Sequence, residues 1–207
     1  MTDEHEAALR LGRWRHTSLS HPDDRMSGMP SYVAFLRAVN VSGRFVKMAE
    51  LRAALEAAGF TEVATYIQSG NVFLRTPLRS ARAVSVELSR VLGQWAGFDV
   101  RAIVRTPTEL RSAVEAVDGV PPLLEAGAKR YVALADAEVP ADAAAELDAW
   151  DRPGERARAL GSHVLAELTI PFHRSSLTNA RIERITGRTT TWRDLTVVRA
   201  LDERWGA

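Results

Sequence analysis

The chain has 207 residues, of which 46% are hydrophobic and 26% charged, with a formal net charge of +1. These values fit an ordinary globular protein with one sizeable core or two small ones, and they give no general attraction to nucleic acid or acidic membranes. The chain has no cysteine, which excludes disulfides, thiolate metal sites and cysteine nucleophiles.

The sequence predicts neither a metal site nor membrane association. The five histidines are scattered without metal-ligand spacing, and no apolar run approaches the roughly 18–20 residues that span a bilayer. We therefore expect no metal, no cofactor and a cytoplasmic location.

Residues 1–28 are predicted to be a disordered or weakly ordered extension. They are polar and contain a Ser-His-Pro-Asp-Asp stretch, with a short helix expected near Glu4–Trp14. The alternative is that the native product starts at Met26 or Met29, and the sequence leaves this open.

Residues 29–118 are predicted to form an N-terminal α+β half. The expected elements are a strand over Tyr32–Val39, a helix over Met48–Ala58, a hairpin of Glu62–Ser69 with Asn71–Thr76, a helix over Ser80–Trp95, a strand over Phe98–Arg105 and a helix starting at Thr106. The first six have the strand, helix, strand, strand, helix, strand order of a ferredoxin-like domain. Thr106 and Glu109 are spaced as a capping box.

The turn-rich residues 119–128 are predicted to be a linker to a C-terminal half over 129–207. The expected elements there are a strand over Lys129–Leu134, a helix over Asp142–Trp150, strands over Arg156–Leu160 and His163–Thr169, a helix over Ser175–Thr186 and a last helix from about Thr191. The fold class is thus α+β, with two ferredoxin-like βαββα(β) halves. Whether they arose by duplication stays open.

The hairpin carries the first candidate binding residues. A two-residue turn at Ser69-Gly70 would place Gln68 opposite Asn71 and Tyr66 opposite Phe73. Tyr66, Gln68, Ser69 and Asn71 would then line a polar ligand site. The alternative is that serine, glycine and asparagine serve only the turn.

A second candidate group follows the first strand. Arg37 near the end of an apolar strand needs a partner or solvent, and Asn40 lies in the loop before the first helix, where backbone amides attract anions. Lys47 is one of two lysines in the chain. The alternative is a loop with a surface lysine.

The C-terminal half adds Arg174, Ser176 and Arg193 as candidates. Arg174 and Ser176 belong to an Arg-Ser-Ser-Leu-Thr stretch at a predicted helix entry, where Ser175 or Ser176 would act as the cap. Arg193 lies in a Trp-Arg-Asp stretch that would open the last helix, with Thr191 as its cap. Capping alone would explain both stretches.

Several segments together resemble one bacterial family, domain of unknown function 1697. They are Phe35–Gly43, Lys47–Leu51, Gly59-Phe60, Thr65–Val72, Val104–Thr106 and Arg174–Thr178. The resemblance covers about residues 31–201 and implies a two-part α+β fold of ferredoxin-like character, with no established reaction. Ser176 stands where the family usually has lysine, and Asp194 where it usually has asparagine, so positive charge is reduced here.

We expect an uncharacterised protein that binds a small polar or anionic, nucleotide-like ligand near the end of the N-terminal sheet. Whether it is an enzyme stays open, because no nucleophile elbow, zincin motif or dinucleotide fingerprint is present. The alternatives are a single-stranded nucleic-acid-binding module and an assembly protein that uses an open sheet edge. The sequence does not fix the oligomeric state.

Overall fold

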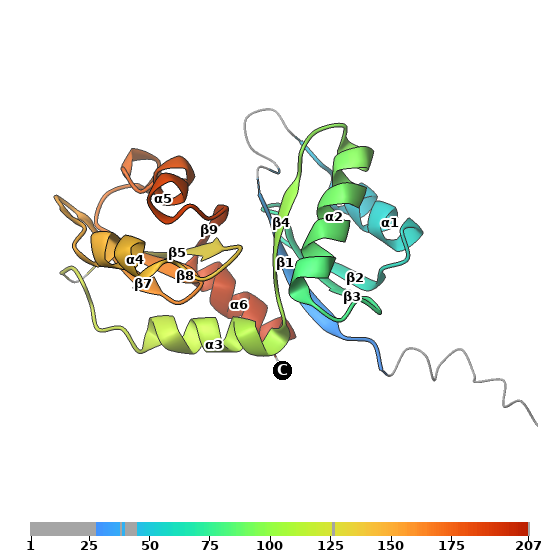
Figure 1. Ribbon diagram of the computed structural model, residues 1–207, viewed down its shortest axis with the longest axis horizontal. Helices are drawn as coiled ribbons and strands as arrows, with labels where there is room; N and C mark the ends of the chain where they lie inside the picture. Colours follow the sequence, from blue (N-terminus) through green and yellow to red (C-terminus); the bar gives the residue numbers. More distant parts are fainter. Residues whose placement is uncertain (1–27, 38, 40–44, 126, 207) are drawn as a thin grey trace, which may run out of the picture.

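The computed structural model describes residues 28–37, 39, 45–125 and 127–206. Within these ranges the chain forms six α-helices and two antiparallel sheets, one sheet in each half of the sequence (Figure 1). The predicted α+β class is therefore confirmed. The predicted extension up to residue 27 and the candidate Asn40 lie outside the described residues.

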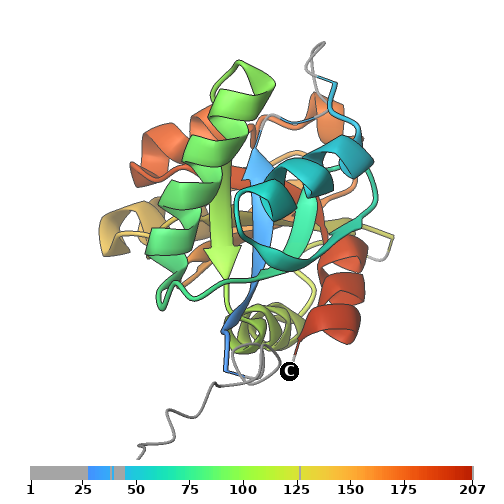
Figure 2. The same ribbon diagram turned by 90° about the vertical axis from the view of Figure 1, so that its right-hand side faces the viewer.

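The first sheet has the strand order β2-β3-β1-β4. Its elements are β1 (Ser31–Arg37), α1 (Met48–Ala57), β2 (Thr61–Tyr66), β3 (Asn71–Arg75), α2 (Ala81–Ala96) and β4 (Arg101–Arg105). Figure 2 shows α1 and α2 in front of this sheet, covering the same face. Leu51 and Leu55 of α1 and Leu88 and Leu92 of α2 form an apolar core on that face, as expected for amphipathic helices on a sheet.

The second sheet has the order β6-β7-β8-β5-β9. The remaining elements are α3 (Pro107–Asp118), β5 (Lys129–Ala135), α4 (Ala141–Asp148), β6 (Asp151–Arg152), β7 (Glu155–Leu160), β8 (His163–Leu168), α5 (Asn179–Thr186), β9 (Thr190–Asp194) and α6 (Leu195–Trp205). The capping box of α3 is present as predicted, with Thr106 and Glu109 bonded to each other's backbone N–H.

Two helices of this half are present, but their predicted starts are wrong. The helix expected from Ser175 starts at Asn179 with Thr178 as its cap, after a short 3₁₀ helix over Phe172–Arg174. The helix expected from about Thr191 starts at Leu195 and is capped by Asp194. The residues before it form the edge strand β9, which pairs with β5, so tertiary pairing overrides the local helix signal.

The two halves have the same plan. When the two-residue strand β6 is set aside, the order β7-β8-β5-β9 repeats the order β2-β3-β1-β4, and the connecting helices recur in the same places. Each repeat ends in a further helix, α3 after β4 and α6 after β9. A position in one sheet therefore has a definable counterpart in the other.

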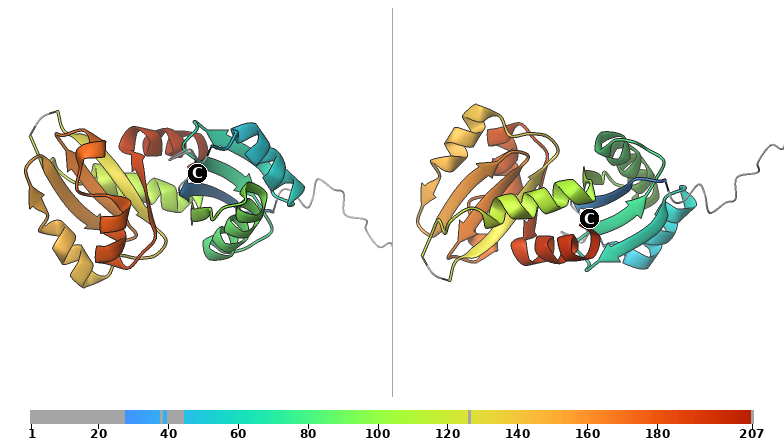
Figure 3. Two further views of the ribbon diagram at one scale, coloured as in Figure 1. Left: turned by 90° about the horizontal axis from the view of Figure 1, so that it is seen from above. Right: turned by 90° about the horizontal axis from the view of Figure 1, so that it is seen from below.

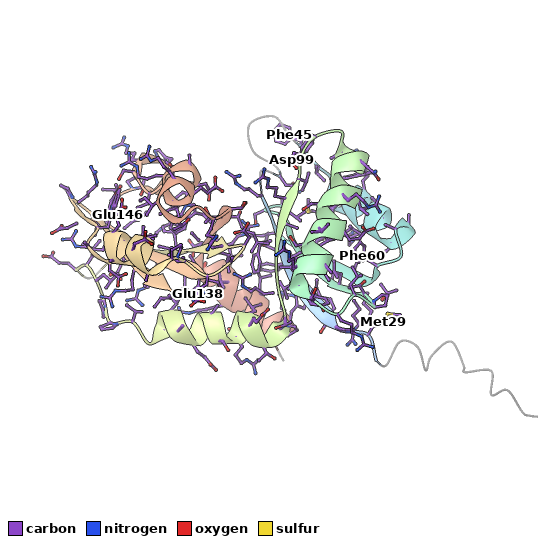
Figure 4. All side chains as sticks on the ribbon, in the orientation of Figure 1. Met29, Phe45, Phe60, Asp99, Glu138 and Glu146 are labelled. Carbon is purple, nitrogen blue, oxygen red and sulfur yellow. The ribbon has the colours of Figure 1, made fainter. Side chains whose placement is uncertain are left out.

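The faces that α1, α2, α4 and α5 leave uncovered meet in a shared core. This core contains Val33, Phe35, Ile103, Val132, Leu134 and Leu165 from the strands and Leu110, Val114, Val198 and Leu201 from α3 and α6. Figure 3 shows α3 and α6 side by side at the junction, and Figure 4 shows side chains of both halves filling the space between the sheets. The halves thus form one packed unit.

Candidate functional site

The hairpin between β2 and β3 has a four-residue turn. Tyr66 lies opposite Asn71 and Ala64 opposite Phe73, so the predicted two-residue turn and its pairing of Gln68 with Asn71 are wrong. The turn includes Ile67 and Gly70 in the left-handed region, with φ of 48° and 73°. A side chain at Gly70 would place its Cβ 2.9 Å from the Cβ of Leu36, so close approach to β1 and the backbone angle both require glycine here.

Asn71 is completely buried and makes three side-chain hydrogen bonds. Its Nδ2 donates to Tyr66 O at 3.1 Å and to Ser69 Oγ at 2.9 Å, and its Oδ1 accepts from Arg193 Nε at 2.6 Å. An asparagine side chain has two donor hydrogens and one carbonyl oxygen. Both donor hydrogens and the carbonyl oxygen of Asn71 are therefore bonded inside the protein.

Arg193 reaches across from β9 to the first sheet, where it binds three carbonyls around the turn. Its Nη2 donates to the carbonyls of Leu36 at 3.0 Å, Ser69 at 2.9 Å and Gly70 at 3.3 Å. Its Nη1 donates within β9, to Thr191 Oγ1 at 2.9 Å and Trp192 O at 2.7 Å. Burial lowers the pKa of Arg193 to about 10, so the group is still a cation at neutral pH and joins the two halves.

The side chains of Arg37, Lys47 and Tyr66, further candidates of the N-terminal half, have other partners. Arg37 pairs with Glu183 at 2.9 Å and Lys47 with Glu50 at 3.0 Å. Tyr66 is half-buried beneath Arg204, whose Cζ is 4.9 Å from the ring centroid. Gln68 is exposed on the turn.

The candidates near Arg174 are organised by a buried carboxylate. Glu155 accepts hydrogen bonds from Ser176 N at 2.6 Å, Ser176 Oγ at 2.5 Å and Trp150 Nε1 at 3.2 Å. Burial by itself raises the pKa of Glu155, but these donors hold it below its usual value. Ser176 is thus bonded to β7 and is not the predicted cap, while Arg174 is exposed.

Arg105, at the end of β4, has the same bonding pattern toward the second sheet. Its Nη2 donates to Ala135 O at 2.6 Å and Ser162 O at 3.1 Å, and its Nη1 donates to Val104 O at 2.9 Å. It is 8% exposed, and among the described residues no carboxylate lies within ion-pair distance of it. Burial lowers its pKa, against the opposing effect of Glu109 and Asp136.

His163 lies next to Arg105 and is only 8% exposed. Within the described part of the chain, neither ring nitrogen has a hydrogen-bond partner. Burial and then the positive charge of Arg105 lower the pKa of His163 to about 4. It is therefore a neutral imidazole at pH 7, with one N–H donor and one acceptor nitrogen.

A cavity of about 840 Å³ opens at these two residues, between the halves. Its walls come from α2, β4 and α3 on one side and from the loops after β5, β7 and α5 on the other. The charged and polar side chains that line it are Arg82, Ser85, Arg105, Thr108, Glu109, Ser112, Asp136, Ser162, His163 and Arg188. Three arginines face two carboxylates, which favours a ligand with negative charge.

The sequence did not single out Arg105 or His163. The argument that drew attention to Arg37, a charge at the end of an apolar strand, applies equally to Arg105. No local signal marks His163, because its neighbour Arg105 is distant in sequence. Nor do the described residues group three or more His, Cys, Asp or Glu side chains so as to hold a metal ion.

A family model described as "Protein of unknown function (DUF1697)" matches residues 29–164. A solved structure, the conserved bacterial protein SP0830 from Streptococcus pneumoniae, is similar at a TM-score of 0.62 and 17% identity, covering 86% of this chain and 99% of that one. That likeness concerns the fold. No curated protein matches the chain. Among the helices that the structure describes, none has the length and apolar character needed to cross a membrane.

Proposed function

Since the chain belongs to the DUF1697 family, whose description gives no activity, we propose a function from the cavity: binding of a small polar ligand between the two halves. The cavity volume of about 840 Å³ falls within the roughly 300–1,000 Å³ of small-molecule sites. Such sites occur preferentially where two structural units meet.

The observation that carries the proposal is the unpaired imidazole of His163 in the wall of this cavity. Leaving buried polar groups without partners costs about 1–3 kcal/mol each. Both ring nitrogens are buried, so a ligand with a polar group would remove this cost once the imidazole turns toward the cavity. At the end of the N-terminal sheet, the side chains of Asn71 and Arg193 already bond to other groups of the protein. We therefore favour the cavity as the ligand site.

A thermal-shift screen with metabolites and nucleotides tests the proposal, because a ligand that binds the folded state raises the melting temperature. Ser112 on α3 is exposed and lines the cavity, so Ser112→Trp should obstruct it. Ala116→Trp, on an exposed part of the same helix away from the cavity, is the matched control. A hit that both variants bind equally well would contradict the proposed location.

A ligand at the end of the N-terminal sheet, bound by Arg37, Lys47 and Gln68, is a second proposal. Among the described residues, each of the two cations pairs with one carboxylate, which leaves further donors of each for an anion. Arg37→Met should then abolish binding of a hit that Ser112→Trp still binds. The nucleic-acid and assembly alternatives stay predictions, tested by salt-dependent retention on single-stranded RNA and by light scattering.

A further inference from the structure

Arg105 and Arg193 occupy equivalent positions in the two repeats, and so do His163 and Asn71. The register of the sheets establishes this. In each sheet the arginine lies opposite one residue of the central strand, and the asparagine or histidine of the same sheet lies opposite the residue two positions further along that strand. The opposed pairs are Arg105 with Val33, Asn71 with Phe35, Arg193 with Val132 and His163 with Leu134.

The two arginines also share their hydrogen bonds to carbonyl groups. Each donates from Nη1 to the carbonyl of its preceding residue, Val104 for Arg105 and Trp192 for Arg193. From Nη2, Arg105 donates to the carbonyls of Ala135 and Ser162, and Arg193 donates to the equivalent carbonyls of Leu36 and Gly70 and also to that of Ser69. In both sheets one of these carbonyls also accepts a bond from the central strand, Gly70 O from Leu36 N and Ser162 O from Ala135 N. The repeats thus bind each other's hairpins reciprocally.

The two sites differ at the Nε of the arginine. Arg193 Nε donates to the amide oxygen of Asn71 at 2.6 Å. Among the described residues, no hydrogen bond of Arg105 uses Nε, and the residue in the place of Asn71 is His163, whose ring nitrogens are unpaired. The cavity opens at this second site. What Asn71 supplies to Arg193, a planar oxygen acceptor, is missing beside Arg105.

We propose that Arg105 and His163 form an oxyanion subsite that binds one carboxylate or phosphate oxygen of the ligand, in the place that Asn71 Oδ1 takes beside Arg193. This deepens the proposed function and rests on it. Arg105 Nε donates to the oxyanion, and the imidazole of His163, whose nitrogens are buried without a partner among the described residues, turns to donate its N–H to the same group. Hydrogen bonds from a cation to an oxyanion are shorter and roughly twice as strong as neutral ones.

The surrounding charges fit a single anionic group at this point. Each carboxylate at the rim has one oxygen engaged by a backbone N–H, Glu109 by Thr106 at 2.8 Å and Asp136 by Thr189 at 3.2 Å. Neither of them pairs with Arg105 within the described residues. The guanidinium is therefore a buried cation whose counter-charge a ligand can provide.

Titration of the ¹⁵N-labelled protein with acetate, with inorganic phosphate and with acetamide tests the subsite. Acetamide has the shape of acetate without its charge. The imidazole signals of His163, assigned with the variant His163→Asn, should shift saturably with acetate or phosphate and at least tenfold more weakly with acetamide. The response to acetate against phosphate identifies which oxyanion the subsite prefers.

His163→Asn should lower the affinity for either oxyanion at least tenfold, because an asparagine here can donate and accept as Asn71 does and so occupy the subsite. His173→Asn, at an exposed histidine on the 3₁₀ helix, should bind as the wild type does. Shifts of His163 that are equal for acetate and acetamide, or absent for both oxyanions, would overturn the subsite. A screening hit that Ser112→Trp loses and His163→Asn keeps would leave the proposed function standing and remove the subsite alone.

Discussion

Replacing Asn71 with alanine should destabilise the protein more than any substitution in the exposed part of the same turn. The variant loses one hydrogen bond to a cation and two neutral ones, and it leaves Arg193 Nε unpaired inside the shared core. Bonds to charged groups contribute about 1.5–3 kcal/mol and neutral ones about 0.5–1.5 kcal/mol each. We expect the free energy of unfolding to fall by about 3–5 kcal/mol.

Urea denaturation followed by circular dichroism measures this loss, and the melting temperature should fall by roughly 6–20 °C for a chain of this size. Gln68→Ala, on the exposed part of the turn, is the control and should change stability by about 0.5 kcal/mol or less. Asn71→Asp keeps an acceptor for Arg193 but loses both donated bonds, so its free energy of unfolding should fall less than that of Asn71→Ala. If Asn71→Ala costs under about 1 kcal/mol, the network does not hold the halves together.

Three further predictions concern other sites. The pKa of His163 is lowered to about 4 in the folded protein. The imidazole is therefore neutral above pH 6.5 whether the chain is folded or unfolded, and between pH 6.5 and 4 it gains a proton only in the unfolded chain. Stability should fall there by up to about 3 kcal/mol, and urea curves of His163→Asn should lack this fall; parallel curves would contradict it. Glu155→Gln replaces a carboxylate that accepts hydrogen bonds from Ser176 and Trp150. Calorimetry should record a fall of about 1–3 kcal/mol in the free energy of unfolding. An unchanged melting temperature would show that the carboxylate is dispensable for stability. Ile67→Asn should stabilise the fold by about 1 kcal/mol, because β-branched Ile67 holds φ at 48° while 48% exposed, and asparagine tolerates that angle; a lower melting temperature would refute it.

The α+β class and most elements could be predicted, because they depend on local signals. The apolar stripe of α2 and the capping box at Thr106 are set within a few residues of chain, and the structure has both. Strand β9 could not be predicted in this way. Its residues Thr190–Asp194 become a strand by pairing with β5, whose partner residues are about sixty positions earlier in the chain.

The candidate residues were chosen because polar side chains in the hairpin had no visible packing role. For Asn71 that role exists but is provided by Arg193, 122 positions away in the sequence. The turn also depends on distant contacts, since Gly70 lies against Leu36 of β1. Polar residues that bind across an interface between repeats therefore look like ligand-binding residues when the sequence is the only information.

Comparing equivalent positions of the two repeats explains why the hydrogen-bond network around Arg193 differs from the one around Arg105. An arginine buried between the repeats needs an acceptor on each of its three nitrogens, because a buried cation without partners is unstable. Carbonyls of the opposite hairpin are available in both repeats, since they belong to the shared backbone plan. For Arg193 Nε the acceptor is the side chain of Asn71, whereas the equivalent position in the other repeat is His163, which among the described residues does not bond to Arg105. A difference at one position thus closes the network around Arg193 and leaves the one around Arg105 incomplete, at the place where the cavity lies.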